Sequence, residues 1–153
     1  MVILMKQTQK QQYNILFILF KYAVLFIFGG ILYMSIELIW RSKTSISMGI
    51  VAGIAFISIG LLNEILDWND PLWLQCLCGC LLITVLELIS GTILNIWLGL
   101  NIWDYSDRWG NYCGQICPLF SFFWFLLSGV AIILDDGLRH LLFNEEIKKY
   151  RWF

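Results

Sequence analysis

The sequence has 153 residues, of which 59% are hydrophobic and only 14% are charged, and its mean hydropathy is +0.75. Soluble domains carry about 25% charged residues, and a soluble domain of this composition would expose a large apolar patch. The formal net charge of −1 gives no basic field for nucleic acid. These values predict a single all-α membrane domain over residues 1–153 and exclude a nucleic-acid-binding protein.

The first apolar run follows a polar N-terminal stretch, residues 1–13. Residues 22–40 approach the length of about 20 residues that a membrane-spanning helix needs. We expect residues 14–21 to extend this helix at the interface, with the Lys21 ammonium reaching the lipid headgroups. The sequence therefore predicts the first span at residues 22–40.

A second span is predicted over residues 46–66. Gly49, Gly53 and Gly60 fall on one face of this helix. Small residues on one face let another membrane helix approach closely. We therefore predict that these glycines pack against a neighbouring helix.

The third predicted span, residues 72–94, contains a carboxylate, Glu87, inside its apolar run. Residues 95–116 mix tryptophans and glycines with asparagines and charged residues. Irregular backbone at membrane depth is tolerated only where protein or water satisfies its polar groups. We expect this irregular segment to be either a short re-entrant piece or an interfacial loop.

The fourth predicted span covers residues 117–134, and residues 135–153 form a tail. The spacing of Asp135 and Arg139 suits an i,i+4 ion pair. Leucines on one side of the tail favour a helix that lies in the membrane interface. The predicted architecture is four transmembrane helices followed by an interfacial C-terminal helix.

Lysine and arginine in the loops set the expected orientation, because cytoplasmic loops are enriched in them. Four spans place both termini on one side, with the cations Lys6, Lys10, Arg139, Lys148, Lys149 and Arg151. The other side carries Arg41, Lys43 and Arg108. We expect both termini in the cytoplasm, with the chain in a bacterial inner or plasma membrane.

Polar residues concentrate at the outer ends of the first and third spans. A charge in the middle of the bilayer costs roughly 2.5–3.5 kcal/mol on insertion scales, so such groups are expected to face the bundle interior and pair. We predict one shared, partly wet polar site made of Glu37, Arg41, Glu87, Asn95, Trp103, Asp104, Tyr105, Arg108 and Asn111.

Two interpretations of this predicted site remain open. Glu37 and Glu87 could form a cation or proton site, or a gate. Alternatively, Arg41 and Asn95 neutralise the two carboxylates and fix the packing of the helices. The residues alone do not choose between them.

Catalytic and metal-binding signatures are missing from the sequence. It has no Walker A motif, no nucleophile–base pair and no dinucleotide fingerprint. Cys76, Cys78 and Cys80 are spaced so that a helix turns Cys78 about 200° from the other two, and no histidine lies near them. We therefore expect no enzyme, no catalytic residue, no cofactor and no metal site.

Several short elements together resemble one family of small membrane proteins. Their residues are Glu37, Gly60 to Glu64, Pro71 to Trp73, Leu86-Glu87, Trp103-Asp104-Tyr105-Ser106, Asn111, Gly114, Ile116-Cys117 and Leu134 to Arg139. Over about residues 35–143 the pattern resembles the family named putative ABC transporter type IV, and within it a short subgroup. The resemblance implies a permease subunit.

The leading hypothesis is a permease-like membrane component of unknown substrate. It would need a separate ATPase, because the chain has no nucleotide site, and copies of itself or another membrane subunit to enclose a path. The alternative is a structural or pore-forming, holin-like protein. A neighbouring ATPase gene would favour transport, whereas a lysin gene or phage cassette would favour the pore.

Overall fold

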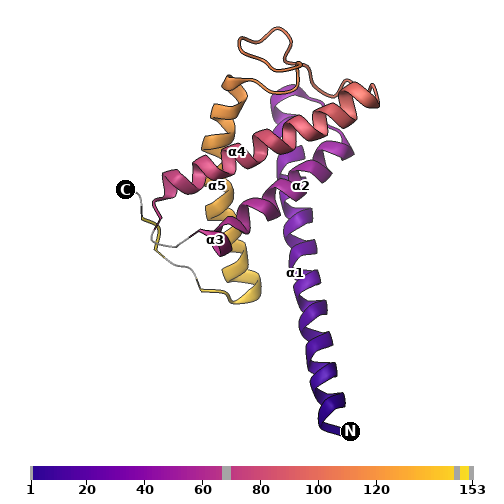
Figure 1. Cartoon of the computed structure of the whole chain (residues 1–153), viewed down its shortest axis with the longest axis vertical. Helices are drawn as coiled ribbons and strands as arrows, with labels where there is room; N and C mark the ends of the chain where they lie inside the picture. The colour runs from indigo at the N-terminus through magenta and orange to yellow at the C-terminus, as the bar shows by residue number, and fades with distance from the viewer. Residues whose placement is uncertain (1, 67–69, 147–148, 152–153) are drawn as a thin grey trace.

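The computed structural model gives an all-helical chain (Figure 1). It describes residues 2–66, 70–146 and 149–151, with residues 2–13, 63 and 64 described by their backbone alone. The helices are α1 (Val2–Arg41), α2 (Ile46–Gly60), α3 (Leu62–Ile65), α4 (Leu72–Gly91), the π-helix η1 (Thr92–Trp97) and α5 (Pro118–Phe143). No strand occurs in the described residues, which confirms the predicted all-α class.

Within the described residues, three helical segments are long and apolar enough to cross a membrane: Asn14–Arg41, Leu72–Trp97 and Pro118–Phe143. The remaining apolar helix, α2, has only 15 residues. At 1.5 Å per residue it extends about 22 Å, less than the roughly 30 Å of a bilayer's hydrocarbon core. The structure therefore has three long candidate spans and one short apolar helix where the sequence predicts four spans.

The predicted span over residues 46–66 is interrupted at one residue. Leu61 separates α2 from α3, although its backbone stays in the right-handed helical region (φ −75°, ψ −16°). The amide of Leu61 still donates to the Ile57 carbonyl oxygen at 2.9 Å. The helical backbone therefore continues from α2 into α3 with a local irregularity at Leu61.

The helices form two pairs that meet at α2. α1 packs mainly along α2, and α4 packs mainly along α5. α2 also contacts both α4 and α5, whereas α1 touches α5 only narrowly. The α1–α2 connection and the loop of residues 98–117 lie at one end of the molecule, and α3 and the C-terminal tail lie toward the other (Figure 1).

Glycines bring α1 and α2 into backbone contact. A Cβ atom placed on Gly30 would lie 2.7 Å from the Gly49 carbonyl oxygen, and one placed on Gly53 would lie 2.7 Å from the Phe26 carbonyl oxygen. Both separations are shorter than a carbon atom tolerates, so larger residues would push the helices apart. Two of the three glycines predicted to pack thus face α1.

The first helix is longer than predicted. α1 runs without a break through residues 14–21 and continues to Arg41. The sequence predicts that the Lys21 ammonium reaches the lipid headgroups. In the structure this ammonium instead forms an ion pair with Glu145 of the tail at 2.7 Å.

The third and fourth predicted spans also end later in the structure than the sequence predicts. Helical structure continues past residue 94 to Trp97 as the π-helix η1. The predicted break at residue 134 is wrong, because α5 is one helix to Phe143 and ends at Asn144, which adopts a left-handed conformation (φ 57°). The Asp135–Arg139 ion pair, at 2.6 Å, lies inside this helix and lets its charges remain buried. The predicted interfacial helix is therefore the last part of α5.

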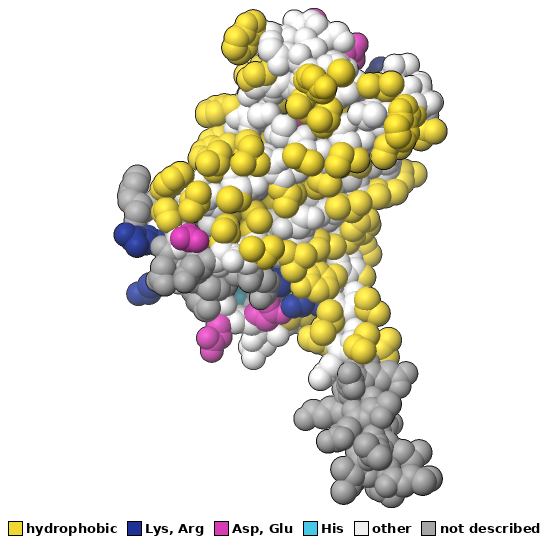
Figure 2. All heavy atoms as spheres, in the orientation of Figure 1, with side chains coloured by type: hydrophobic (Ala, Val, Ile, Leu, Met, Phe, Trp, Pro, Cys, Tyr) yellow, Lys and Arg dark blue, Asp and Glu magenta, His cyan; other side chains and the backbone are white. Residues whose placement is uncertain are grey.

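The outer surface between the two ends is dominated by apolar side chains. On the face shown in Figure 2, the described charged side chains gather toward the tail and near the loop, with a broad hydrophobic band between them. Ile39 is 87% exposed and Trp40 is 83% exposed. A surface of this kind is suited to lipid or to other apolar helices.

Some sequence predictions lie outside the described residues. They concern the side chains of Lys6 and Lys10 and the residue Lys148. Part of the lysine and arginine bias that predicts the orientation therefore rests on side chains that the structure does not describe.

Replacing Gly53 by leucine is expected to disrupt the α1–α2 contact, because the new side chain would meet the Phe26 backbone. Overpacking of this type typically costs about 1–3 kcal/mol. The matched change Ala52→Leu adds its side chain at a partly open cavity that Ala52 lines and should retain more folded protein. Folded yield and melting temperature in detergent measure the difference. Equal values for the two variants would contradict a close interface at Gly53.

Candidate intramembrane polar site

Glu87 of α4 is buried and receives two hydrogen bonds from different parts of the chain. The Tyr105 hydroxyl donates to Oε1 at 2.9 Å, and the Trp124 indole Nε1 donates to Oε2 at 2.9 Å. The residue is 6% exposed. Glu87 thus connects α4 to the loop and to α5 through neutral donors.

Tyr105 is held in place by its own contacts. Its backbone amide donates to the Gly114 carbonyl oxygen at 2.8 Å. Its ring stacks on Phe120, with centroids 4.4 Å apart and planes at 15°. Burial, together with the neighbouring Glu87 carboxylate, raises the pKa of the Tyr105 hydroxyl above its usual value. Tyr105 therefore remains a protonated hydrogen-bond donor to Glu87.

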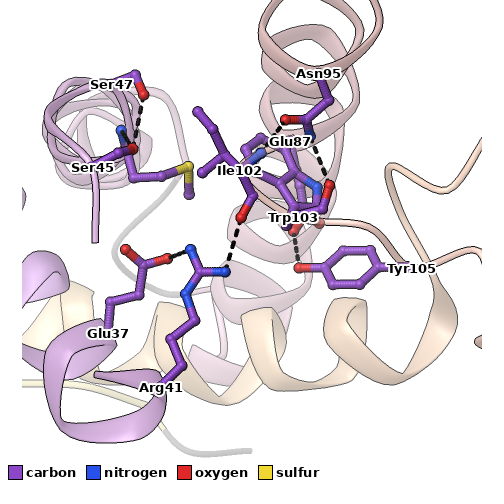
Figure 3. A network of polar contacts seen from close by, with 10 residues as sticks. Glu37, Arg41, Ser45, Ser47, Glu87, Asn95, Ile102, Trp103 and Tyr105 are labelled. Atoms are coloured by element: carbon purple, nitrogen blue, oxygen red, sulfur yellow. Dashed lines mark hydrogen bonds and ion pairs between the residues drawn. The ribbon is translucent and has the colours of Figure 1, made fainter. Parts of the chain in front are cut away.

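The second buried carboxylate, Glu37, lies one turn before the end of α1 and forms an ion pair with Arg41. The other nitrogen of the guanidinium, Nη1, donates to the Ile102 carbonyl oxygen at 3.0 Å, which ties the end of α1 to the loop (Figure 3). In the described part of the chain, Glu37 Oε2 is buried without a hydrogen-bond partner.

Asn95, on η1, fastens the loop to the helices. Its amide donates to the Trp103 carbonyl oxygen at 3.0 Å and to Gln115 Oε1 at 2.8 Å, and its Oδ1 accepts from the Ile102 amide at 2.7 Å. The Trp103 indole donates to the Gln115 carbonyl oxygen at 3.1 Å. These bonds satisfy backbone groups of an irregular segment, as burial requires.

The remaining predicted site residues lie on the exposed part of the loop and shape it. Asp104 accepts hydrogen bonds from the Ser106 hydroxyl and amide, which hold the pKa of its carboxyl below the usual value. Asn111 donates to the carbonyl oxygens of Ser106 and Arg108. Arg108 is exposed beside Asp107 at 3.5 Å. In the described residues these groups form no bond with Glu37 or Glu87.

The residues predicted from the sequence do not include three that belong to this site: Tyr33, Gln115 and Trp124. A signal for Trp124 existed, because it follows Ser121 by three residues and precedes Ser128 by four, on the polar face of α5. Gln115 had no such signal, because its contacts with Asn95 depend on how the loop folds back.

A second buried charge cluster lies toward the other end of the molecule. Asp135 is fully buried and Arg139 is 4% exposed. Beyond its bond to Asp135, the Arg139 guanidinium lies 3.6 Å from Glu145, the carboxylate that also binds Lys21. This cluster connects α1, α5 and the tail.

The tail also contacts the rest of this end directly. The Tyr150 hydroxyl donates to Asp136 at 2.6 Å, and the Leu72 amide donates to the Arg151 carbonyl oxygen at 2.7 Å. Gly60, the third of the predicted packing glycines, lies against the Asp135 carboxylate, where a side chain would collide with it. The tail thus crosses the start of α4 and the end of α5.

A cavity of about 120 Å³ lies between the two helix pairs. Its walls come from α1, α2, α4, α5 and, at Trp103, the loop, and most of the lining is apolar. Of the predicted site residues, Glu87 and Trp103 line it, together with Tyr33 and Trp124. Glu37 and Arg41 are not among the lining residues and reach the same loop through Ile102.

Residues suited to a metal ion are not gathered at this site. In the part of the chain that the structure describes, no three histidine, cysteine, aspartate or glutamate side chains are placed to hold one. The chemistry that the site offers is therefore a carboxylate, aromatic rings and hydrogen-bond donors beside an apolar cavity.

The long apolar helices place the chain in the class of multi-pass membrane proteins. The family described as putative ABC-transporter type IV matches residues 1–149. The chain belongs to this family, as the sequence elements at Glu37, Leu86-Glu87 and Trp103-Asp104-Tyr105-Ser106 predicted. No curated protein and no solved structure matches the chain.

Substituting Glu87 by alanine is expected to destabilise the fold, because the Tyr105 hydroxyl and the Trp124 indole would both lose their acceptor. A buried donor left unsatisfied costs about 1–3 kcal/mol. Glu87→Gln should cost less, since the amide keeps the shape and one acceptor oxygen. Thermal unfolding in detergent compares the two.

The control for these variants is Asp107→Ala, which removes an exposed carboxylate of the loop. It should change stability by no more than about 0.5 kcal/mol. If Glu87→Ala is as stable as this control, Glu87 does not hold the loop and α5 together.

Proposed function

We propose that this chain is the membrane-embedded, permease-like subunit of a transport system whose energy comes from a separate ATPase. The observation that carries the proposal is the buried carboxylate Glu87, which lines a cavity between two helix pairs in a member of a transporter-type family. Intramembrane ionisable residues commonly mark substrate or ion pathways. The sequence has no Walker A motif, so ATP hydrolysis requires another polypeptide.

The arrangement of the contacts supports movement of one helix pair relative to the other. At the loop end, α1 reaches the α4–α5 half through Arg41 and the Ile102 carbonyl oxygen. Toward the tail, it does so through the Lys21–Glu145 ion pair and through edge-on contacts of the Phe17 and Phe20 rings with Phe143. The packing of α2 against α4 and α5 makes α2 the joint, and water can replace the two polar contacts at lower cost than this packing. Opening one of them while the other stays closed would expose the cavity to one side.

We further propose that the subunit works with a second copy or with another membrane protein. Four helices enclose only a small cavity, and the outer face of α1 is apolar over residues 15–20, which are all exposed. A path for a substrate across the membrane would be completed by a partner that covers such faces. Nucleic acid has no role in this proposal.

Purification of the tagged full-length chain from its native membrane with mild detergent tests the ATPase requirement. The expected result is co-purification of a subunit that carries a Walker A motif, with ATPase activity in the complex. A tagged unrelated membrane protein from the same cells is the control. Reconstituted vesicles containing the complex should take up substrate only with ATP.

The pore-forming alternative makes the opposite prediction for the chain alone. If vesicles containing only this chain release a trapped fluorescent dye without ATP, and no ATPase co-purifies, the permease-like proposal is wrong. Retention of the dye by these vesicles in the absence of ATP agrees with the permease-like proposal.

Both termini are proposed to lie in the cytoplasm, because the tail side carries more lysine and arginine. Green fluorescent protein fused after Phe153 should fluoresce, since it folds in the cytoplasm, and alkaline phosphatase at the same place should be inactive. The matched fusion after Gly110, in the loop at the other end, should give the reverse pattern. An active phosphatase after Phe153 would reject this orientation.

A further inference from the structure

The cavity between the two helix pairs has one charged side chain in its lining. Most of its wall is hydrocarbon, contributed by residues such as Leu32, Val51 and Ile83. Among the described residues that line it, Glu87 is the only acidic or basic one. A ligand that fits this cavity must therefore be largely apolar and must have one group suited to a carboxylate.

Among the described residues, neutral hydrogen-bond donors but no basic side chain contact the Glu87 carboxyl group. In the described part of the chain no basic side chain forms an ion pair with Glu87, because Arg41 pairs with Glu37 and Arg139 with Asp135. Its two hydrogen bonds come from neutral donors, and a carboxylate can accept about four. In surroundings of low dielectric constant, such a group attracts a cation strongly.

Aromatic rings stand beside this carboxylate in the cavity wall. Tyr33, Trp103 and Trp124 all line the cavity, and the Tyr33 and Trp124 rings lie 6.3 Å apart at an angle of 37°. The faces of aromatic rings attract alkylammonium groups, and tryptophan does so best. An acidic group with several rings is therefore a recognition surface for an organic cation, whereas it would repel an anion.

From these features we infer that the cavity binds an amphiphilic organic cation, with its ammonium group at Glu87 and the rings and its apolar body against the helices. This inference rests on the permease-like function proposed above and names the substrate class. The cavity volume of about 120 Å³ suits a compact head with one ring or a short chain. A longer body would extend through the open side of the cavity.

The test compares two probes of the same shape, phenyltrimethylammonium and its neutral isostere tert-butylbenzene. Radiolabelled probes are equilibrated with the purified full-length chain in nanodiscs of phosphatidylcholine, whose headgroups carry no net charge. Binding is measured without ATP and without a partner. The binding result is therefore independent of whether an ATPase co-purifies with the chain, and the co-purification result is independent of whether the probes bind.

We expect saturable binding of the cation, and Glu87→Gln should weaken it about tenfold or more through loss of the charge while leaving tert-butylbenzene binding unchanged. Asp107→Asn removes an acidic charge from the exposed loop and should leave the binding of both probes unchanged. Ala52→Leu fills the cavity from α2 and should abolish the binding of both.

Three outcomes overturn the inference. The first is that the wild-type chain shows no saturable binding of phenyltrimethylammonium, and the second is that Glu87→Gln weakens its binding less than fivefold. The third is that Ala52→Leu, which keeps the carboxylate, still binds it. The Ala52 variant alone decides the question if the Glu87 variant does not fold.

Discussion

Burial of a carboxylate in hydrocarbon is the constraint on which the site depends. Glu87 can remain inside α4 only because other groups satisfy its oxygens, and those groups come from the loop and from α5. The loop must therefore fold back over the helix end, where Asn95 satisfies its backbone in turn. One costly group thus determines the conformation of residues far along the chain.

Close contact between α1 and α2 supplies the second element of the architecture. Lipid tails are as apolar as leucine, so membrane helices associate through packing and hydrogen bonds rather than through exclusion of water. Gly30, Gly49 and Gly53 permit backbone contact between these helices. The short helix α2 then presents its other sides to α4 and α5, which makes it the joint between the two helix pairs.

Polar clusters at both ends of the molecule flank an apolar cavity. One joins Arg41 to the loop, and the other joins Lys21 and Arg139 to Glu145 of the tail. Within the cavity, Glu87 is positioned among aromatic rings without a basic partner in the described residues. A permease needs a binding site that is exposed first to one side of the membrane and then to the other. Close packing of α1 on α2, polar contacts at both ends of the cavity and one buried carboxylate are suited to that task.

The amino-acid sequence by itself determined the class of the protein and the identity of most polar residues that matter. Composition and apolar runs suffice for an all-α membrane domain, because backbone groups in lipid must be satisfied internally and apolar runs of about 20 residues do so as helices. Local spacing also identified the Asp135–Arg139 ion pair, whose residues are one helical turn apart. Short sequence elements distributed along the chain identified the family.

Only the tertiary structure decided which polar groups meet. The sequence placed Glu87 and Arg108 in one predicted site, yet Tyr105 and Trp124 bind the Glu87 carboxylate and Arg108 remains exposed. Lys21 reaches Glu145 across 124 positions of the chain, and α5 continues past residue 134 because its charges are buried in pairs. Such partners cannot be read from helical periodicity, which specifies the face of a side chain but not the segment that the fold brings against it.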